Sequence, residues 1–159
     1  MRILGIDPGT GILGFGVIDA GSGNKVSLID GGVIRTPVKQ ADYLRLETIY
    51  DELSQLISEH KPDVMAVEKL FFAQNVTTAM SVSQARGVVL LAGVKNGLEL
   101  YEYTPLQIKQ ALTGYGRADK KQIQEMVRIM LRLDEAPKPD DCADALAAAI
   151  CHSMTARFA

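Results

Sequence analysis

The sequence has no uninterrupted apolar run of 18 residues, and no basic start followed by a long uncharged apolar segment. The first absence excludes a membrane-spanning helix, and the second removes the usual mark of a secretion signal. Its two cysteines, Cys142 and Cys151, fall in one expected helix with Cα atoms about 13 Å apart, too far for a disulfide. We therefore expect a reduced, cytoplasmic protein with no membrane partner.

Histidine is equally scarce, with two residues in the chain, and there is no internal repeat or low-complexity segment. The chain has 159 residues, of which 47% are apolar and 23% are charged. This length and composition are typical of a single globular domain, which we expect to span residues 1–159.

The net charge of −2 is unevenly distributed. The stretch from Lys69 to Leu133 carries +5, and the rest of the chain carries −7. A basic central stretch flanked by acidic segments is compatible with a phosphate-binding face. A solvated surface of mixed charge is the alternative.

The order of the expected elements predicts an α/β fold. Apolar alternation and turn residues predict strands at 2–7, 14–19, 25–36 (interrupted at Gly31-Gly32), 63–68 and 98–103. Helical periodicity predicts helices at 42–60, 77–96, from 105, from 119 or 120 to 133, and 140–157. Three strands joined by short turns imply an antiparallel meander, and a strand that follows a helix joins in parallel. We expect a mixed five-stranded sheet flanked by helices.

Local signals predict where the helices begin, and they single out one helix that is unusually apolar. The expected N-caps are Asp42, Thr77 or Thr78, Thr104 and Asp140. The helix at 77–96 is apolar almost all round, so one face covers the sheet and the rest needs a second cover. We expect a subunit interface there, with a symmetric homodimer as the commonest arrangement.

Four carboxylates occupy special positions. Asp7 and Glu68 end two strands, whereas Asp141 and Asp144 are three residues apart and share one face of a helix near its start. Helix capping is the alternative role for an aspartate there, but Asp140 is the better capping candidate. Carboxylates that meet in a cleft repel one another unless cations lie between them.

The ligand chemistry of such a cluster favours Mg²⁺, with Mn²⁺ as a substitute, because the donors are hard oxygens without a matching His/Cys set. Two such ions about 4 Å apart suit phosphodiester hydrolysis, in which they activate a water molecule and stabilise the leaving oxygen.

Five motifs together resemble the RuvC Holliday-junction resolvases, in order and over nearly the whole chain. They are Ile6-Asp7-Pro8-Gly9-Thr10, Val67-Glu68-Lys69-Leu70-Phe71, Gln84-Ala85-Arg86-Gly87, Tyr103-Thr104-Pro105 with Lys109, and Asp141-Cys142-Ala143-Asp144-Ala145-Leu146-Ala147. The resemblance implies a ribonuclease-H-like fold and a homodimeric, Mg²⁺-dependent endodeoxyribonuclease. Such an enzyme nicks two opposing strands of a four-way DNA junction symmetrically in recombination and repair, and works with the RuvA-RuvB branch-migration complex.

The resemblance also implies roles for individual residues. Asp7, Glu68, Asp141 and Asp144 match the metal-binding catalytic carboxylates, and some relatives have histidine at the position of Asp141. Phe71 matches an aromatic residue that stacks on a base. Lys109 and Lys120 match basic residues that contact DNA or support catalysis, and the adjacent Lys121 is a second candidate for the role of Lys120.

Taken alone, these aromatic and basic residues have simpler explanations. Phe71 or Phe72 would pack in the core, but two adjacent aromatics after a strand cannot both point inward. One is therefore free to stack on a base. Lys109 and Lys120 alone would be solvated surface residues.

Two other functions compete with junction cleavage. Asp7-Pro8-Gly9-Thr10 also resembles the first phosphate loop of actin-like and sugar-kinase ATPases. Those proteins close two such domains on a nucleotide, and this chain holds one. A non-catalytic protein that binds DNA structures is the second alternative, but it gives the clustered carboxylates no purpose.

Overall fold

The computed structural model describes residues 1–69 and 76–156. Its strands are β1 (Arg2–Asp7), β2 (Ile12–Ala20), β3 (Val26–Arg35), β4 (Val64–Glu68) and β5 (Glu99–Tyr103). Its helices are α1 (Asp42–His60), α2 (Val76–Lys95), α3 (Pro105–Thr113), α4 (Lys120–Leu131) and α5 (Asp140–Thr155).

The strands form one mixed sheet in the order β3-β2-β1-β4-β5. β1, β2 and β3 are antiparallel neighbours, whereas β4 is parallel to β1 and β5 is parallel to β4. The predicted five-stranded mixed sheet is therefore confirmed. Because β1 and β4 are parallel neighbours, their carboxyl ends meet at one edge of the sheet.

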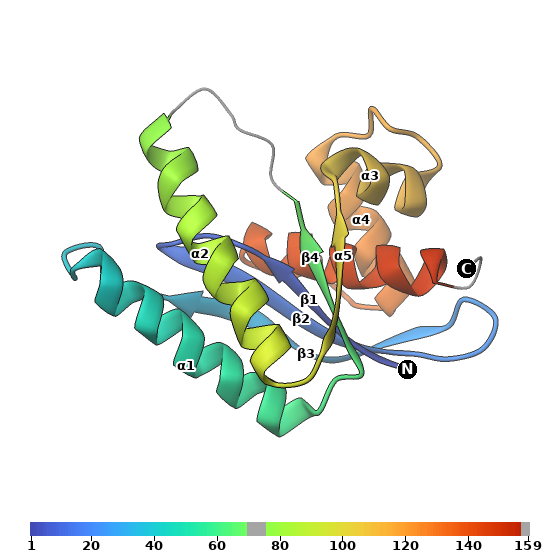
Figure 1. Cartoon of the computed structure of the whole chain (residues 1–159). Coiled ribbons are helices and arrows are strands. Elements are labelled where there is room, and N and C mark those ends of the chain that lie inside the picture. Colours follow the sequence, from blue (N-terminus) through green and yellow to red (C-terminus); the bar gives the residue numbers. More distant parts are fainter. Residues whose placement is uncertain (70–75, 157–159) are drawn as a thin grey trace.

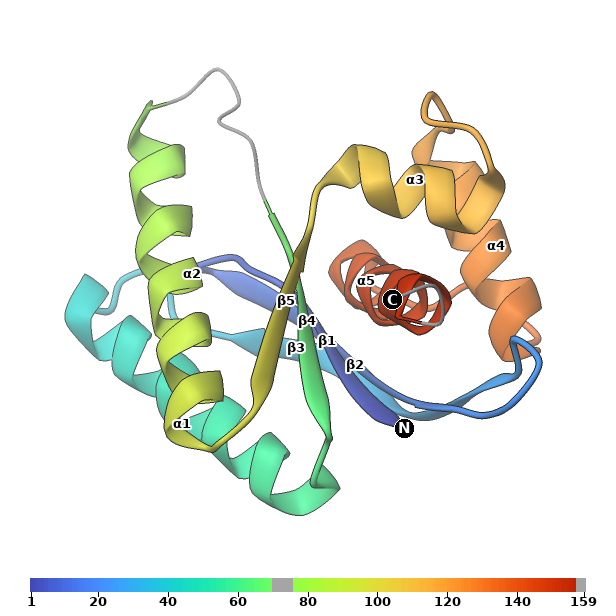
Figure 2. The same cartoon turned by 45° about the vertical axis from the view of Figure 1, so that its right-hand side comes forward.

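Helices cover both faces of the sheet (Figure 1). α1 and α2 pack on one face, and α5 packs on the other beneath α3 and α4 (Figure 2). Alternation along β1 sends Ile3 into the core on the α5 side, and Leu4 and Ile6 into the core on the α1 and α2 side. The same alternation decides which face of the sheet the last side chain of a strand points to.

Helix α5 lies unusually close to the sheet because glycines face it. A Cβ atom added to Gly5 would lie 2.0 Å from the backbone oxygen of Ala145, and one added to Gly16 would lie 2.4 Å from the side chain of Leu146. Gly5 and Gly16 are partners in the β1–β2 ladder. The missing side chains leave a shallow trough in the sheet, and the alanine-rich helix fits into it.

The predicted interruption of the third strand at Gly31-Gly32 is wrong. β3 is continuous, and both glycines have partners on β2. The irregularity lies two residues earlier, where Val17 pairs with Asp30 but Ile18 pairs with Leu28, so that Ile29 is the extra residue of a bulge.

Three of the four predicted caps are also wrong. Ala41 precedes α1 and Pro139 precedes α5, so Asp42 and Asp140 are the first helical residues and neither is a cap. Thr77 and Thr78 lie inside α2. Thr104 does cap α3, with its side chain accepting from Gln107 N.

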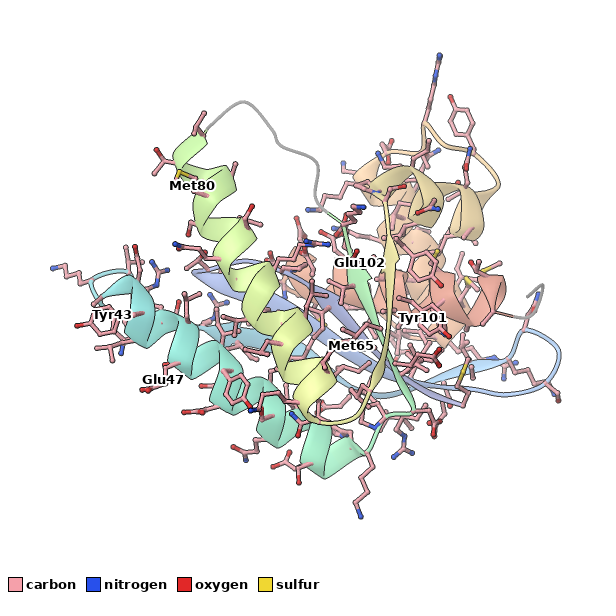
Figure 3. All side chains as sticks on the ribbon, viewed as in Figure 1. Tyr43, Glu47, Met65, Met80, Tyr101 and Glu102 are labelled. Carbon is pink, nitrogen blue, oxygen red and sulfur yellow. The ribbon has the colours of Figure 1, made fainter. Side chains whose placement is uncertain are left out.

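Helix α2 keeps part of its apolar surface exposed, as the sequence suggests. Met80 is 63% exposed and points away from the sheet, and Val76, Leu91 and Val94 are exposed as well (Figure 3). The sheet covers only the opposite side of the helix. Even so, none of the described helices combines the length and the apolar character needed to cross a membrane.

Candidate active site

Strand alternation puts Asp7 and Glu68 side by side on the α5 face. Asp7 follows Ile3 and Gly5 on that face of β1, and Glu68 follows Val64 and Ala66 on that face of β4. Ile6 and Val67 are partners in the parallel ladder, so the two carboxylates come directly after a matched pair. The two side chains share a hydrogen bond.

Helix α5 adds the other two carboxylates from above the sheet. Gly14 pairs with Asp7 in the ladder, and a Cβ atom on Gly14 would lie 1.9 Å from the backbone oxygen of Asp141. The first turn of α5 therefore rests on the sheet at Asp7. Asp144 is one turn further along the same helix.

Electrostatic interactions connect Asp7 to each of the other three carboxylates. Burial raises the pKa of Asp7, and the charges of Glu68, Asp144 and Asp141 raise it further. Burial and the charge of Asp144 likewise raise the pKa of Glu68. Burial raises the pKa of Asp144 despite the opposing effect of Lys120. A site whose carboxylates resist ionisation in this way favours added positive charge.

Two lysines share a cavity of about 230 Å³ with two of these carboxylates. Glu68, Asp144, Lys109 and Lys120 all line it. The Nζ atom of Lys120 lies 3.3 Å from a carboxylate oxygen of Asp144 and 3.4 Å from one of Asp140. The cavity is therefore lined by both negative and positive side chains.

Helix capping decides which lysine enters this cavity. Asp119 caps α4 in a capping box with Gln122, so Lys120 is the first helical residue. Lys121 points elsewhere and lines a different pocket with Thr113 and Glu125. Of the two lysines, Lys120 is therefore the one that lies beside the carboxylates. Phe71 lies outside the described residues.

The donor set fits a hard divalent cation, because it consists of carboxylate oxygens, and burial raises the pKa of Asp7, Glu68 and Asp144. In their present positions, however, no three acidic, histidine or cysteine side chains of residues 1–69 and 76–156 are close enough to hold one ion. Asp144 is paired with Lys120 in this arrangement. Metal binding would therefore require the carboxylates to close.

The two histidines and the two cysteines of the chain have structural roles. His152 is buried and its Nδ1 atom lies 2.7 Å from the hydroxyl oxygen of Tyr103, so it takes no part in the carboxylate group. His60 ends α1 and pairs with Asp30. Cys142 and Cys151 are free and buried.

Sequence reasoning missed two features that shape the site. The role of Gly14 depends on a helix more than 120 residues away in the chain, and no local signal indicates it. Arg86 was noticed only as part of a motif. In the structure it forms an ion pair with Glu102 of β5 and so joins α2 to the edge strand (Figure 3).

A family model described as "Crossover junction endodeoxyribonuclease RuvC" matches residues 3–152. The chain belongs to the RuvC family. It is 57% identical to the crossover junction endodeoxyribonuclease RuvC of Alkaliphilus metalliredigens over 99% of this chain and 96% of that relative. RuvC membership decides against the ATPase alternative, and it is consistent with the use of a divalent metal ion.

Solved structures agree with the RuvC assignment. Thermus thermophilus RuvC in complex with Holliday junction substrate is 39% identical, with a TM-score of 0.95, over 99% of this chain and 96% of that one. The yeast mitochondrial Holliday junction resolvase Ydc2 is 16% identical, with a TM-score of 0.68, over 96% of this chain and 78% of that one. This second likeness concerns the fold, and it confirms the ribonuclease-H-like class.

Proposed function

We propose that this chain is a single-domain, structure-selective endonuclease that resolves four-way DNA junctions by paired symmetric nicks. The observation that carries the proposal is the convergence of Asp7, Glu68, Asp141 and Asp144 from β1, β4 and α5 beside a lysine-lined cavity. The solved complex of the Thermus thermophilus relative with Holliday junction substrate supports the choice of DNA substrate. The cell process would be homologous recombination and DNA repair in the cytoplasm.

The four carboxylates are the proposed ligands of Mg²⁺, with Mn²⁺ as a substitute. The bound ions would supply an activated water molecule and stabilise the leaving oxygen of a phosphodiester. Asp7 is the central ligand, because it is 9% exposed and all three other carboxylates act on its pKa. Asp141 and Asp144 come from α5, so the position of this helix on the sheet sets the geometry of the whole group.

The lysines have a separate proposed task. Lys109 and Lys120 line the same cavity as Glu68 and Asp144. Phosphate groups approaching four carboxylates are repelled, and cations on the cavity wall offset that repulsion. Because Lys120 pairs with Asp144, it is also placed to release that carboxylate when a metal ion binds. Phe71 remains a proposed base-stacking residue from its motif alone.

A homodimer would supply the second active site that paired nicks require. The described chain holds one carboxylate group, and two opposed strands must be cut. The exposed apolar residues of α2 are the proposed dimer surface. The branch-migration complex RuvA-RuvB is the proposed partner on the junction.

The decisive experiment is cleavage of a synthetic four-way junction in Mg²⁺ by wild type, Asp7→Asn and Asp51→Asn. We expect symmetric nicks from wild type and from Asp51→Asn, since Asp51 is exposed on α1. Asp7→Asn should bind the junction without cutting it. EDTA should abolish cleavage, and Mg²⁺ or Mn²⁺ should restore it.

Two results would count against the proposal. Cleavage by Asp7→Asn at the wild-type rate would remove Asp7 from the metal site. Junction binding by wild type without any cleavage in Mg²⁺ or Mn²⁺ would favour the non-catalytic alternative.

A further inference from the structure

A single arginine on α1 lies against the turn that follows the catalytic strand. Arg45 is partly buried, and its Nε atom donates to the hydroxyl oxygen of Thr36 at 3.0 Å. That hydroxyl donates in turn to the backbone oxygen of Thr10 at 2.5 Å. Thr36 N also donates to the backbone oxygen of Gly11 at 3.0 Å. Arg45 is thereby fixed to the segment that begins three residues after Asp7.

The turn itself is shaped to receive the guanidinium group. A Cβ atom added to Gly11 would lie 3.3 Å from a terminal nitrogen of Arg45, so the absence of a side chain there leaves room for it. Thr36, its anchor, is only 5% exposed. A guanidinium group that is held through Nε by a buried hydroxyl keeps its orientation, and its two terminal nitrogens stay available to bind a ligand.

Arg45 has no acidic partner in the part of the chain that the structure describes. Within residues 1–69 and 76–156, Arg45 forms no ion pair with a carboxylate, and its terminal nitrogens have no hydrogen-bond acceptor. By contrast, Arg2, Arg86 and Arg128 each pair with an aspartate or glutamate. If Arg45 served only to hold the turn, a neutral side chain would satisfy Thr36 without a partly buried charge.

We propose that Arg45 binds a phosphate of the DNA backbone at the active site. This inference rests on the proposed function. Arg45 reaches the turn from the α1 and α2 face of the sheet, whereas Lys109 and Lys120 belong to α3 and α4 on the other face (Figure 2). A DNA strand that crosses the carboxylates therefore meets a cation on each side of them. Arg45 lies outside the basic stretch from Lys69 to Leu133, which contains both lysines.

The test uses Asp7→Asn as a parent that binds the junction without cutting it. Adding Arg45→Gln should weaken junction binding by roughly tenfold at moderate salt, because a charge-assisted contact is lost. The slope of log affinity against log salt concentration should fall by about one, as for one phosphate contact. The matched control is Lys25→Gln, an exposed residue on the hairpin turn between β2 and β3, which should change neither quantity.

Two additional measurements separate phosphate binding from support of the turn. Thr36→Val keeps the charge but removes its anchor, so it should weaken binding several-fold with the salt slope unchanged. Single methylphosphonate substitutions should reveal one phosphate whose neutralisation weakens binding by the parent but not by the Arg45→Gln protein. Melting temperatures of all variants confirm that each protein is folded.

An unchanged salt slope for Arg45→Gln, or the absence of any methylphosphonate position specific to Arg45, would overturn the inference while leaving junction cleavage by wild type intact. Absence of junction cleavage by wild type in Mg²⁺ and in Mn²⁺ would instead reject the proposed function.

Discussion

Gly14 is the ladder partner of Asp7, and the backbone of Asp141 occupies the space that a side chain on Gly14 would fill. A residue without a side chain thus brings the first turn of α5 onto the end of β1 at Asp7. The proximity of two carboxylates from distant parts of the chain depends on this contact.

Gly14→Ala should therefore damage both stability and activity. The added methyl group would lie 1.9 Å from the carbonyl oxygen of Asp141, so α5 must shift away from Asp7. We expect a loss of about 1–3 kcal/mol in the free energy of unfolding, measured by urea denaturation, and a large loss of junction cleavage. Gly21→Ala is the control, since its methyl group meets atoms no closer than 3.8 Å. Equal stability of the two variants would contradict close packing at Gly14.

Lys120 and Lys121 should differ in their effect on cleavage. Lys120 contacts Asp144 inside the cavity, whereas Lys121 lines a separate pocket. Lys120→Ala should lower the rate of junction cleavage by roughly tenfold or more, and Lys121→Ala should leave it within a factor of about three. Single-turnover cleavage at saturating protein gives the comparison. A larger defect in Lys121→Ala would exchange the two roles.

The metal-free protein should lose stability as the pH rises. The pKa values of Asp7 and Glu68 are raised in the folded state, so their protonated forms favour folding. This contribution is complete below the unfolded pKa of about 4 and disappears as the pH rises through the folded pKa values, at about 1.4 kcal/mol per pH unit per proton.

Thermal unfolding in EDTA at pH 5 and pH 8 measures this effect. Asp7→Asn should flatten the decrease in melting temperature, because asparagine does not ionise. A parallel decrease in both proteins would assign the pH dependence to other groups. Adding Mg²⁺ at pH 8 should stabilise wild type more than Asp7→Asn.

The exposed stripe of α2 should control the oligomeric state. Val76, Met80, Leu91 and Val94 fall within about 60° of one another around the helix at 100° per residue. Leu91→Glu should convert a dimer to a monomer in analytical ultracentrifugation at micromolar concentration. Ile129→Glu, which alters an equally exposed apolar residue on α4, should not. A monomeric wild type would reject the dimer.

Local sequence signals predicted every strand and helix within a few residues, because each element has a clear period and several have clear turns or caps. These signals failed where a residue type is compatible with more than one local structure. Gly31-Gly32 indicated a break, but both glycines pair with β2 and the bulge falls at Ile29. Asp42 and Asp140 were assigned as caps by residue type, although Ala41 and Pro139 hold those positions.

The sequence by itself determined the family and the α/β order, and it predicted the four carboxylates as metal ligands, because motif spacing and strand alternation are local properties. Alternation alone places Asp7 and Glu68 on the same face as Gly5 and Ala66. Tertiary structure decided which charges act together. It brought Lys120 to Asp144, turned Lys121 away, and attached Arg45 to the turn after Asp7 through Thr36. These relationships depend on how helices pack on the two faces of the sheet, and no local pattern in the sequence predicts that packing.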